Sequence, residues 1–177
     1  MKIGVLADTH IPDRRRALPA RVMELFAPVE IVLHAGDITS MDVLQQLEDR
    51  VSLTFAVFGE CDPQTVRSFL QETQVLEFGG CRIGLIHGNR DPRAEATARV
   101  RNLLRASPYT PDYLDYLKGR FPEVDAIVFG HTHQPYAKVH NGIFYFNPGS
   151  LVPKGGSGSV GLLEIDTRGI SGRILTL

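Results

Sequence analysis

Residues Ile127-Val128-Phe129-Gly130-His131-Thr132-His133 combine a short apolar run with a glycine and two histidines one residue apart. The apolar run predicts a buried strand, and Gly130 would let the chain turn sharply where that strand ends. Residues two apart in an extended segment point to the same side, so His131 and His133 can face one point if the extension persists. Because imidazole is the commonest metal ligand near neutral pH, the stretch indicates a metal site, with two surface-loop histidines as the alternative.

A similar arrangement recurs along the chain, where a buried strand is followed by a loop that carries acidic or imidazole side chains. Strands of this kind are predicted at 2–7, 30–34, 51–58 and 82–86, and a further strand is expected at 74–78. Seven ligand-type side chains follow the predicted strands: Asp8, His10, Asp37, Glu60, His87, His131 and His133. Seven candidates exceed what one ion needs, so they imply two ions that share a carboxylate. Mixed imidazole and carboxylate ligands suit Mn, Fe, Co, Ni or Zn rather than Ca.

The region at 89–122 is the one long stretch without strand character. Helices are predicted there at 94–104 and 112–118, and elsewhere at 17–26 and from Thr39 or Ser40 to about 47. The region leaves and re-enters at strand ends that carry candidate ligands, so we expect a helical insertion over the site. Its arginines could clamp a phosphate and its tyrosines could stack on a base, with a solvated helix pair as the alternative. These residues are Arg90, Arg93, Arg99, Arg101, Arg105, Tyr109, Tyr113 and Tyr116.

Later strands are predicted at 136–139 and 143–146 around the turn signal His140-Asn141-Gly142, and at 160–165 and 170–177. The 177 residues favour one domain, and a net charge of −1 argues against a nucleic acid bound through bulk charge. No apolar run is long enough to span a membrane, and two cysteines are too few for a disulfide framework. We therefore expect a cytoplasmic protein with reduced thiols, for which a homo-oligomer is possible.

The order of these motifs resembles that of the calcineurin-like metallophosphoesterase superfamily. The matching motifs are Asp8-x-His10, Gly36-Asp37, Gly59-x-x-Asp62, His87-Gly88 and Gly130-His131-x-His133. The small size, Cys61 and Asn147-Pro148-Gly149-Ser150 are similar to the small prokaryotic phosphodiesterase branch of that superfamily. The resemblance implies a four-layer αββα sandwich, in which two mixed β-sheets flanked by helices carry a dinuclear metal site at one end.

Carried over by position, the resemblance assigns Asp8, His10 and His133 to one ion and makes Asp37 the bridging ligand. Glu60, His87 and His131 would hold the other ion. It also implies a catalytic group of Asp37, Glu60, Cys61, Asp62 and His87. Two positions depart from the wider pattern, because relatives usually have Asn in place of Glu60 and many have His in place of Cys61. Metal binding is therefore better supported than full catalytic power.

The function implied is hydrolysis of phosphodiester bonds, with phosphomonoesters also possible, by a hydroxide that bridges two divalent ions. Manganese is the first expectation for the metal, and Ni, Co, Fe and Zn are alternatives. The expected partner is a small phosphoester, with nucleotide-like esters as one candidate class. A non-catalytic scaffold is the rival interpretation, because a eukaryotic relative with this fold works chiefly through protein contacts. The chain keeps all four ligand histidines, which favours an enzyme.

Overall fold

The computed structural model describes the backbone of residues 1–102, 107–153 and 155–177, and their side chains except those of residues 98–102. The strands form two sheets of five strands each. The first sheet has the order β10 (Gly169–Thr176), β9 (Ser159–Asp166), β1 (Lys2–Leu6), β2 (Ile31–Ala35) and β3 (Leu53–Val57). The second has the order β4 (Thr73–Phe78), β5 (Cys81–Ile86), β6 (Ala126–Val128), β8 (Ile143–Asn147) and β7 (Tyr136–His140). Both sheets mix parallel and antiparallel pairs, which confirms the predicted fold class.

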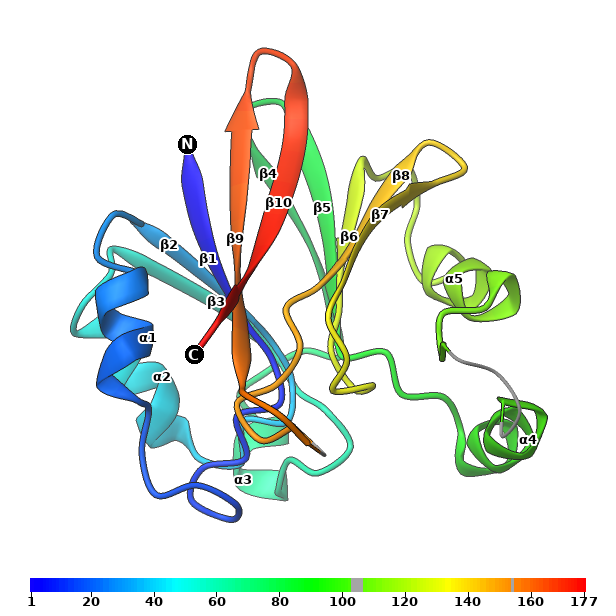
Figure 1. Cartoon of the computed structure of the whole chain (residues 1–177), viewed down its shortest axis with the longest axis horizontal. Helices are drawn as coiled ribbons and strands as arrows, with labels where there is room; N and C mark the ends of the chain where they lie inside the picture. Colours follow the sequence, from blue (N-terminus) through cyan, green and yellow to red (C-terminus); the bar gives the residue numbers. More distant parts are fainter. Residues whose placement is uncertain (103–106, 154) are drawn as a thin grey trace.

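Helices lie on the outer faces of the two sheets (Figure 1). Helices α1 (Ala20–Leu25) and α2 (Met41–Glu48) flank the first sheet, and α5 (Pro111–Lys118) flanks the second. The shorter α3 (Gln64–Arg67) and the helix α4 (Pro92–Asn102) lie towards the lower end of the molecule in this view. None of the helices within the described residues is long and apolar enough to cross a lipid bilayer.

Side-chain alternation along the strands builds three apolar layers. On β1, Ile3 and Val5 point into the core between the sheets, whereas Leu6 points into the cluster beneath α1 and α2. A third cluster joins the outer face of the second sheet to α5 through Leu114 and Leu117. Each fully buried side chain of this kind contributes about 1.5–3 kcal/mol to stability. The layers therefore follow the expected helix–sheet–sheet–helix order.

Helix ends differ from the predictions where proline or a capping hydroxyl decides the boundary. Helix α1 begins at Ala20 rather than at 17, because the preceding Pro19 is extended, with φ −62° and ψ 139°. Helix α5 begins at Pro111, one residue earlier than expected, because the Thr110 hydroxyl accepts a hydrogen bond from Tyr113 N at 3.3 Å. Helix α3 is a single turn and is too short to be predicted from the sequence pattern.

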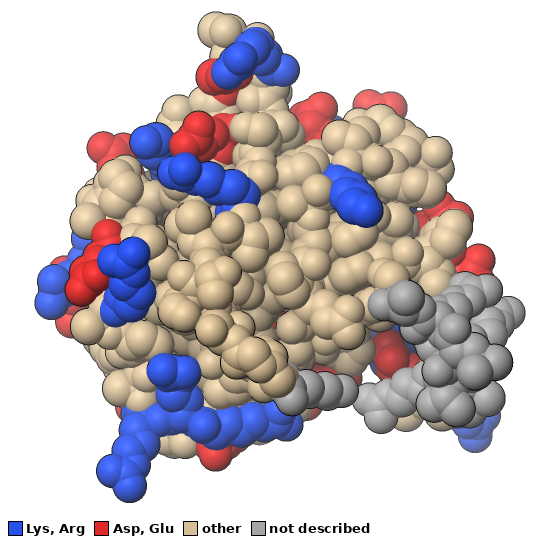
Figure 2. All heavy atoms as spheres, in the orientation of Figure 1, with Lys and Arg blue, Asp and Glu red and all other residues tan. Residues whose placement is uncertain are grey.

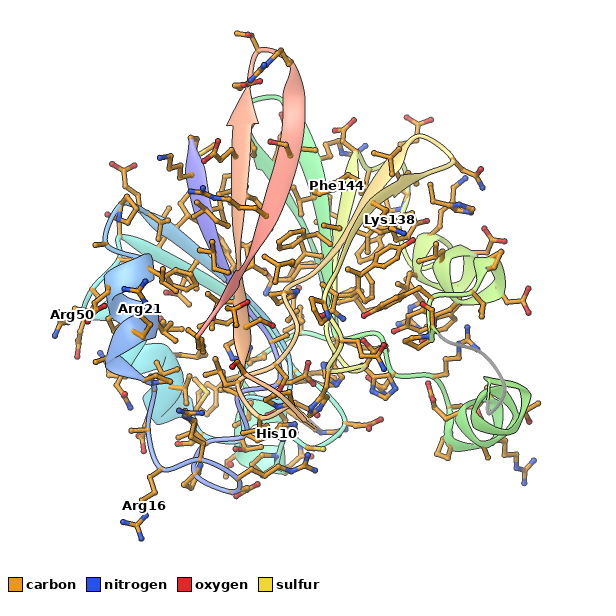
Figure 3. All side chains as sticks on the ribbon, viewed as in Figure 1. His10, Arg16, Arg21, Arg50, Lys138 and Phe144 are labelled. Atoms are coloured by element: carbon orange, nitrogen blue, oxygen red, sulfur yellow. The ribbon has the colours of Figure 1, made fainter. Side chains whose placement is uncertain are left out.

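Parallel pairing brings the candidate ligands to one end of the sandwich. Strands β1, β2 and β3 run parallel in the first sheet, and β5, β6 and β8 run parallel in the second. The carboxyl ends of parallel strands meet at one edge of a sheet, and the loops that carry the ligands follow β1, β2, β3, β5 and β6. Figure 3 shows His10 at this end, opposite the hairpin between β9 and β10.

Candidate metal centre

The loops after β1, β2 and β6 adopt an unusual backbone conformation. Six non-glycine residues in them have positive φ: Asp8 (52°), His10 (47°), Asp37 (55°), Thr39 (69°), His131 (66°) and His133 (58°). This conformation is uncommon for residues with a side chain and concentrates at functional sites. Backbone hydrogen bonds tie the loops together, from Asp8 N to Gly36 O and from His10 N to Asp37 O, each at 3.0 Å.

The geometry of the two loop histidines differs from the prediction. The extended conformation does not persist past Gly130, because His131 and His133 both have left-handed φ values. As a result the two rings do not face one point. His133 joins Asp8 and His10, whereas the His131 ring lies beside that of His87, with centroids 5.4 Å apart. The two histidines therefore contribute to opposite sides of the site.

Asp8, His10 and His133 form the first cluster, with one ligand atom from each lying within 4.8 Å of the others. Asp8 Oδ1 lies 3.3 Å from His133 Nε2, which in turn lies 3.3 Å from His10 Nε2. His133 Nδ1 donates to the carbonyl of Val152 at 3.2 Å, so neutral His133 keeps a free lone pair on Nε2. Both nitrogen atoms and the carboxylate therefore converge on one point.

Asp8, Asp37 and His87 form a second cluster of the same size. His87 Nδ1 donates to the carbonyl of Ala35 at 2.8 Å, which leaves Nε2 facing Asp37 Oδ2 at 3.4 Å. The same Asp37 oxygen lies 3.6 Å from His10 Nε2. Asp37 therefore stands between the two sides of the site, at the place expected of a bridging carboxylate.

Opposing effects set the pKa values of Asp37 and His87. Burial raises the pKa of Asp37, but hydrogen bonding from His87 and from Cys61 N outweighs it, so the pKa lies well below its usual range. Burial lowers the pKa of His87, but the hydrogen bond to Asp37 and the charges of Asp8 and Asp37 raise it to about 9. In the metal-free protein the pair is therefore a carboxylate and an imidazolium at neutral pH.

Glu60 and His131 lie beside these clusters rather than inside them. Glu60 Oε1 is 3.5 Å from His131 Nδ1, and the Glu60 side chain is 41% exposed. Among the described residues, the groups that converge within 4.8 Å contain neither of the two. The structure therefore places both at the outer edge of the second side, adjacent to His87 through the His131 ring.

Asp62 braces the loops through backbone groups. Its Oδ2 accepts hydrogen bonds from Asp37 N at 3.1 Å and Gly59 N at 2.7 Å, and its Oδ1 accepts one from Thr39 N at 2.7 Å. Both oxygens of this buried carboxylate are thus engaged by main-chain donors. Asp62 therefore holds the backbone of the loops at Asp37, Thr39 and Gly59, and the catalytic role that the resemblance implies for it stays a prediction.

Cys61 contacts Asp37. Its backbone N donates to Asp37 Oδ1 at 2.8 Å, and its sulfur falls in a group with His10 and Asp37. Desolvation and a hydrogen bond to Asp37 raise the pKa of the thiol to about 12. Cys61 therefore remains a neutral thiol beside the site.

Two residues that the sequence analysis missed support the site. Arg67 of α3 donates to three carbonyl groups of the loop that carries Glu60, namely those of Asp62 (2.8 Å), Gly59 (3.0 Å) and Glu60 (2.7 Å). Glu95 of α4 places Oε1 3.2 Å from His131 Nε2. The positions of Arg67 and Glu95 in the sequence give no signal of these roles, because both residues act through contacts that depend on how α3 and α4 pack against the loops.

The Asn147-Pro148-Gly149-Ser150 turn also supports the site. Asn147 Nδ2 donates to Gly130 O at 2.7 Å, and Ser150 Oγ donates to Asp8 O at 2.8 Å. His34 lies deeper, with Nε2 3.1 Å from Thr9 Oγ1, and burial lowers its pKa to about 3. These contacts hold the loops rather than adding ligands.

The aromatic side chains of the insertion are engaged within the protein. The Tyr113 and Tyr116 hydroxyls donate to Gly88 O at 3.1 Å and to Asn89 O at 2.8 Å. The Arg90 guanidinium lies over both rings, 4.9 and 5.3 Å from their centroids. Tyr113 is buried, so it is not open to a substrate base as the sequence analysis suggested. The side chains of Arg99, Arg101 and Arg105 lie outside the described residues.

The clusters fit divalent transition-metal ions. Both oxygens of Asp8, which is 0% exposed, lack a hydrogen-bond partner within the described part of the chain. A buried carboxylate without a hydrogen bond is costly, and a cation would compensate it. The donors are imidazole nitrogens and carboxylate oxygens, a mixture typical of Mn, Fe, Co, Ni and Zn sites. The site is therefore a candidate metal centre, in which Asp8 belongs to both clusters and Asp37 Oδ2 faces His10 on one side and His87 on the other.

Comparisons with known proteins agree with this geometry. Residues 1–168 match the calcineurin-like phosphoesterase superfamily domain. A probable metallophosphoesterase of Methanothermobacter thermautotrophicus is 37% identical over 180 residues, which span 99% of this chain and 92% of that protein.

Two solved structures are similar in fold at 22% identity. Vacuolar protein sorting 29 from Cryptosporidium parvum has a TM-score of 0.70, with 99% of this chain and 97% of that chain covered. A novel archaeal phosphodiesterase has a TM-score of 0.67, with 100% of both chains covered. The match over most of the chain, together with the clustered Asp and His ligands, confirms the resemblance in the motifs: the chain belongs to the calcineurin-like phosphoesterase superfamily.

Proposed function

We propose that the chain is a dinuclear metal-dependent phosphoesterase that hydrolyses phosphodiester bonds in small substrates, with phosphomonoesters as a second substrate class. The observation that carries this proposal is the position of Asp37, whose Oδ2 lies 3.6 Å from His10 Nε2 and 3.4 Å from His87 Nε2. A carboxylate between two groups of ligands is what a pair of ions requires. The family of the chain and its archaeal relative support the same chemistry.

The ligands divide between the two sides of Asp37. Asp8, His10 and His133 would hold one ion, and His87, with His131 and Glu60 at the outer edge, would hold the other. When bound, two such ions activate the attacking water and neutralise charge on the phosphoryl oxygens. Manganese is the metal we propose first, and the donor set also suits Ni, Co, Fe and Zn.

The residues of the chain shape this chemistry around the ions. Cys61 is a neutral thiol and therefore a poor nucleophile, so water is the attacking group. The exposed Arg14 lies close enough to the site for its positive charge to act on His10, whose pKa is lowered chiefly by burial and in smaller part by Arg14. Figure 2 shows Lys and Arg side chains gathered at the lower left of this face, where Figure 3 places Arg16. A cluster of positively charged side chains of this kind attracts an anionic phosphoester.

The decisive experiment is a phosphoester panel on metal-free protein, with Mn, Ni, Co, Fe and Zn added back one at a time. Hydrolysis of bis(p-nitrophenyl) phosphate and p-nitrophenyl phosphate would be followed together with the number of ions bound per chain. Turnover should appear with at least one metal at two ions per chain. Asp37→Asn should abolish it, whereas Asp42→Asn on the exposed face of α2 should not. Saturation at one ion or fewer would refute the dinuclear centre.

A non-catalytic scaffold is the second candidate. The observation that favours it is the half-exposed Glu60, which stands outside the converging groups and weakens the second side of the site. The similarity to vacuolar protein sorting 29 shows that this fold is shared with that protein, and no more. Two bound ions without turnover of any ester in the panel would favour the scaffold over the enzyme.

A further inference from the structure

Helix α4 places a carboxylate against the metal centre. Glu95, in the first turn of the helix, lies with Oε1 3.2 Å from His131 Nε2, and its side chain is only 17% exposed. The same oxygen accepts a hydrogen bond from Arg90 N at 3.3 Å, which fixes its position. A glutamate side chain is ordinarily ionised at neutral pH, so Oε1 is a hydrogen-bond acceptor.

A carboxylate oxygen accepts, so His131 Nε2 carries the proton of this hydrogen bond. The other ring nitrogen, Nδ1, then faces Glu60 Oε1 at 3.5 Å, on the side where the ring lies beside His87. Glu95 thus determines which nitrogen of His131 is free to bind an ion. A ligand histidine whose second nitrogen donates to a carboxylate is held in one tautomer and becomes a stronger ligand.

The other two histidines that are oriented in this way depend on the backbone. His87 Nδ1 donates to Ala35 O and His133 Nδ1 donates to Val152 O, and neither acceptor can be removed by substituting a side chain. His131 alone among these three is held by a side chain, and that side chain comes from the insertion between β5 and β6. The second side of the site is therefore the side that depends on where α4 docks.

We propose that Glu95 is a positioning residue for the second metal ion: by accepting the Nε2 proton of His131, it presents Nδ1 as the ligand atom. This inference rests on the proposed dinuclear centre. It also means that docking of α4 and binding of the second ion support each other, because the same hydrogen bond contributes to both.

The test compares Glu95→Ala and Glu95→Gln with Asp91→Ala in full-length protein. Asp91 Oδ1 accepts from Arg93 N at 2.8 Å and Ala94 N at 3.1 Å, so Asp91→Ala loosens the start of α4 but leaves the Glu95 carboxylate in place. Binding of Mn²⁺ would be measured by calorimetric titration. Zn²⁺-loaded protein labelled with ¹⁵N-histidine would report by NMR which His131 nitrogen carries the proton.

We expect Glu95→Ala to weaken the weaker of two Mn²⁺ sites by about 10–100-fold, the usual cost of removing such a partner. Glu95→Gln, which keeps an oxygen acceptor, should retain the protonated Nε2 signal and lose less affinity. Asp91→Ala, which loosens the start of α4 but keeps the Glu95 carboxylate, should weaken the second site less than Glu95→Ala does. Unchanged affinity in Glu95→Ala would overturn the inference. So would equal losses in the Ala and Gln variants, which would indicate that the carboxylate itself is a ligand. One ion in the wild-type protein would instead refute the dinuclear centre on which the inference rests.

Discussion

Replacing Asp62 tests whether its hydrogen bonds to main-chain groups hold the loops of the site in place when no metal is bound. The buried carboxylate accepts three main-chain hydrogen bonds, from Asp37 N, Thr39 N and Gly59 N. Asp62→Ala leaves three buried donors without an acceptor, at about 1–3 kcal/mol each. Some would be rehydrated in the space left by the side chain, so we expect a loss of about 3–6 kcal/mol. That is a large part of the ~5–15 kcal/mol typical of a folded domain.

Asp62→Asn provides the matched comparison. The Asn oxygen can take the place of Oδ2 and keep the bonds from Asp37 N and Gly59 N, while its amide group faces the Thr39 N–H. One of three bonds is lost, so the expected cost is about 1–3 kcal/mol. Urea denaturation of the metal-free variants, followed by far-UV circular dichroism, measures both losses without a contribution from metal binding. Asp115→Ala on the exposed face of α5 should stay close to wild type.

Two results would refute this reasoning. If Asp62→Ala cost less than about 1 kcal/mol, the three hydrogen bonds would not hold the loops. If Asp62→Asn were as destabilising as Asp62→Ala, the number of bonds lost would not determine the effect. Either result would indicate that the left-handed turn at Asp37 forms for another reason.

Three further predictions concern charge at the site. Glu60→Asn removes a negative charge 3.5 Å from His131 Nδ1, so kcat/KM for an anionic diester should rise about tenfold, which corresponds to an activation free energy lower by ~1.4 kcal/mol. Loss of activity while both ions stay bound would contradict this prediction. Because the pKa of His87 is raised to about 9, its contribution to the stability of the metal-free protein is present below pH 6.5 and is lost as pH rises towards 9. Mn²⁺ affinity should increase over the same range, because His87 must lose its proton to bind metal. A Mn²⁺ affinity that does not change with pH would refute the pairing of His87 with Asp37. Arg14→Ala should raise KM for an anionic ester, and the effect should shrink as salt increases; an effect independent of salt would exclude attraction by charge.

The layers and the gathering of Asp8, His10, Asp37, His87 and His133 at one end could be predicted from the sequence, because both depend on short-range patterns. Alternation in β1 separates Ile3 and Val5 from Leu6, and this is enough to build a two-faced sheet. Because β1 and β2 are parallel, Asp8 and Asp37, which follow them, lie at the same edge of the first sheet.

The finer geometry of the site depended on contacts between distant segments. His131 and His133 have left-handed φ values, and Gly130 before them lies against Ala35 O and Asp8 Oδ2 of the first sheet, contacts that the motif Gly-His-x-His alone does not reveal. Glu95 lies 36 residues before His131 in a helix whose own sequence looks the same wherever it docks. Arg67 likewise belongs to a single-turn helix too short to give a periodic signal.

The candidate ligands straddle the seam between the sheets. Asp8, His10, Asp37 and Glu60 follow strands of the first sheet, whereas His87, His131 and His133 follow strands of the second. A pair of bound ions would therefore link the two sheets. At a free metal concentration one hundred times its Kd, each ion would add about 2.7 kcal/mol to the free energy of unfolding.

The same seam is closed from within by Phe146, whose ring lies so close to Gly161 of the facing sheet that a Cβ there would overlap it. A side chain larger than glycine at 161 would wedge the halves apart. Phe146 directly precedes Asn147, which donates to Gly130 O, and Gly161 pairs with Val5 of the strand that leads to Asp8, so we expect such a substitution to weaken metal binding.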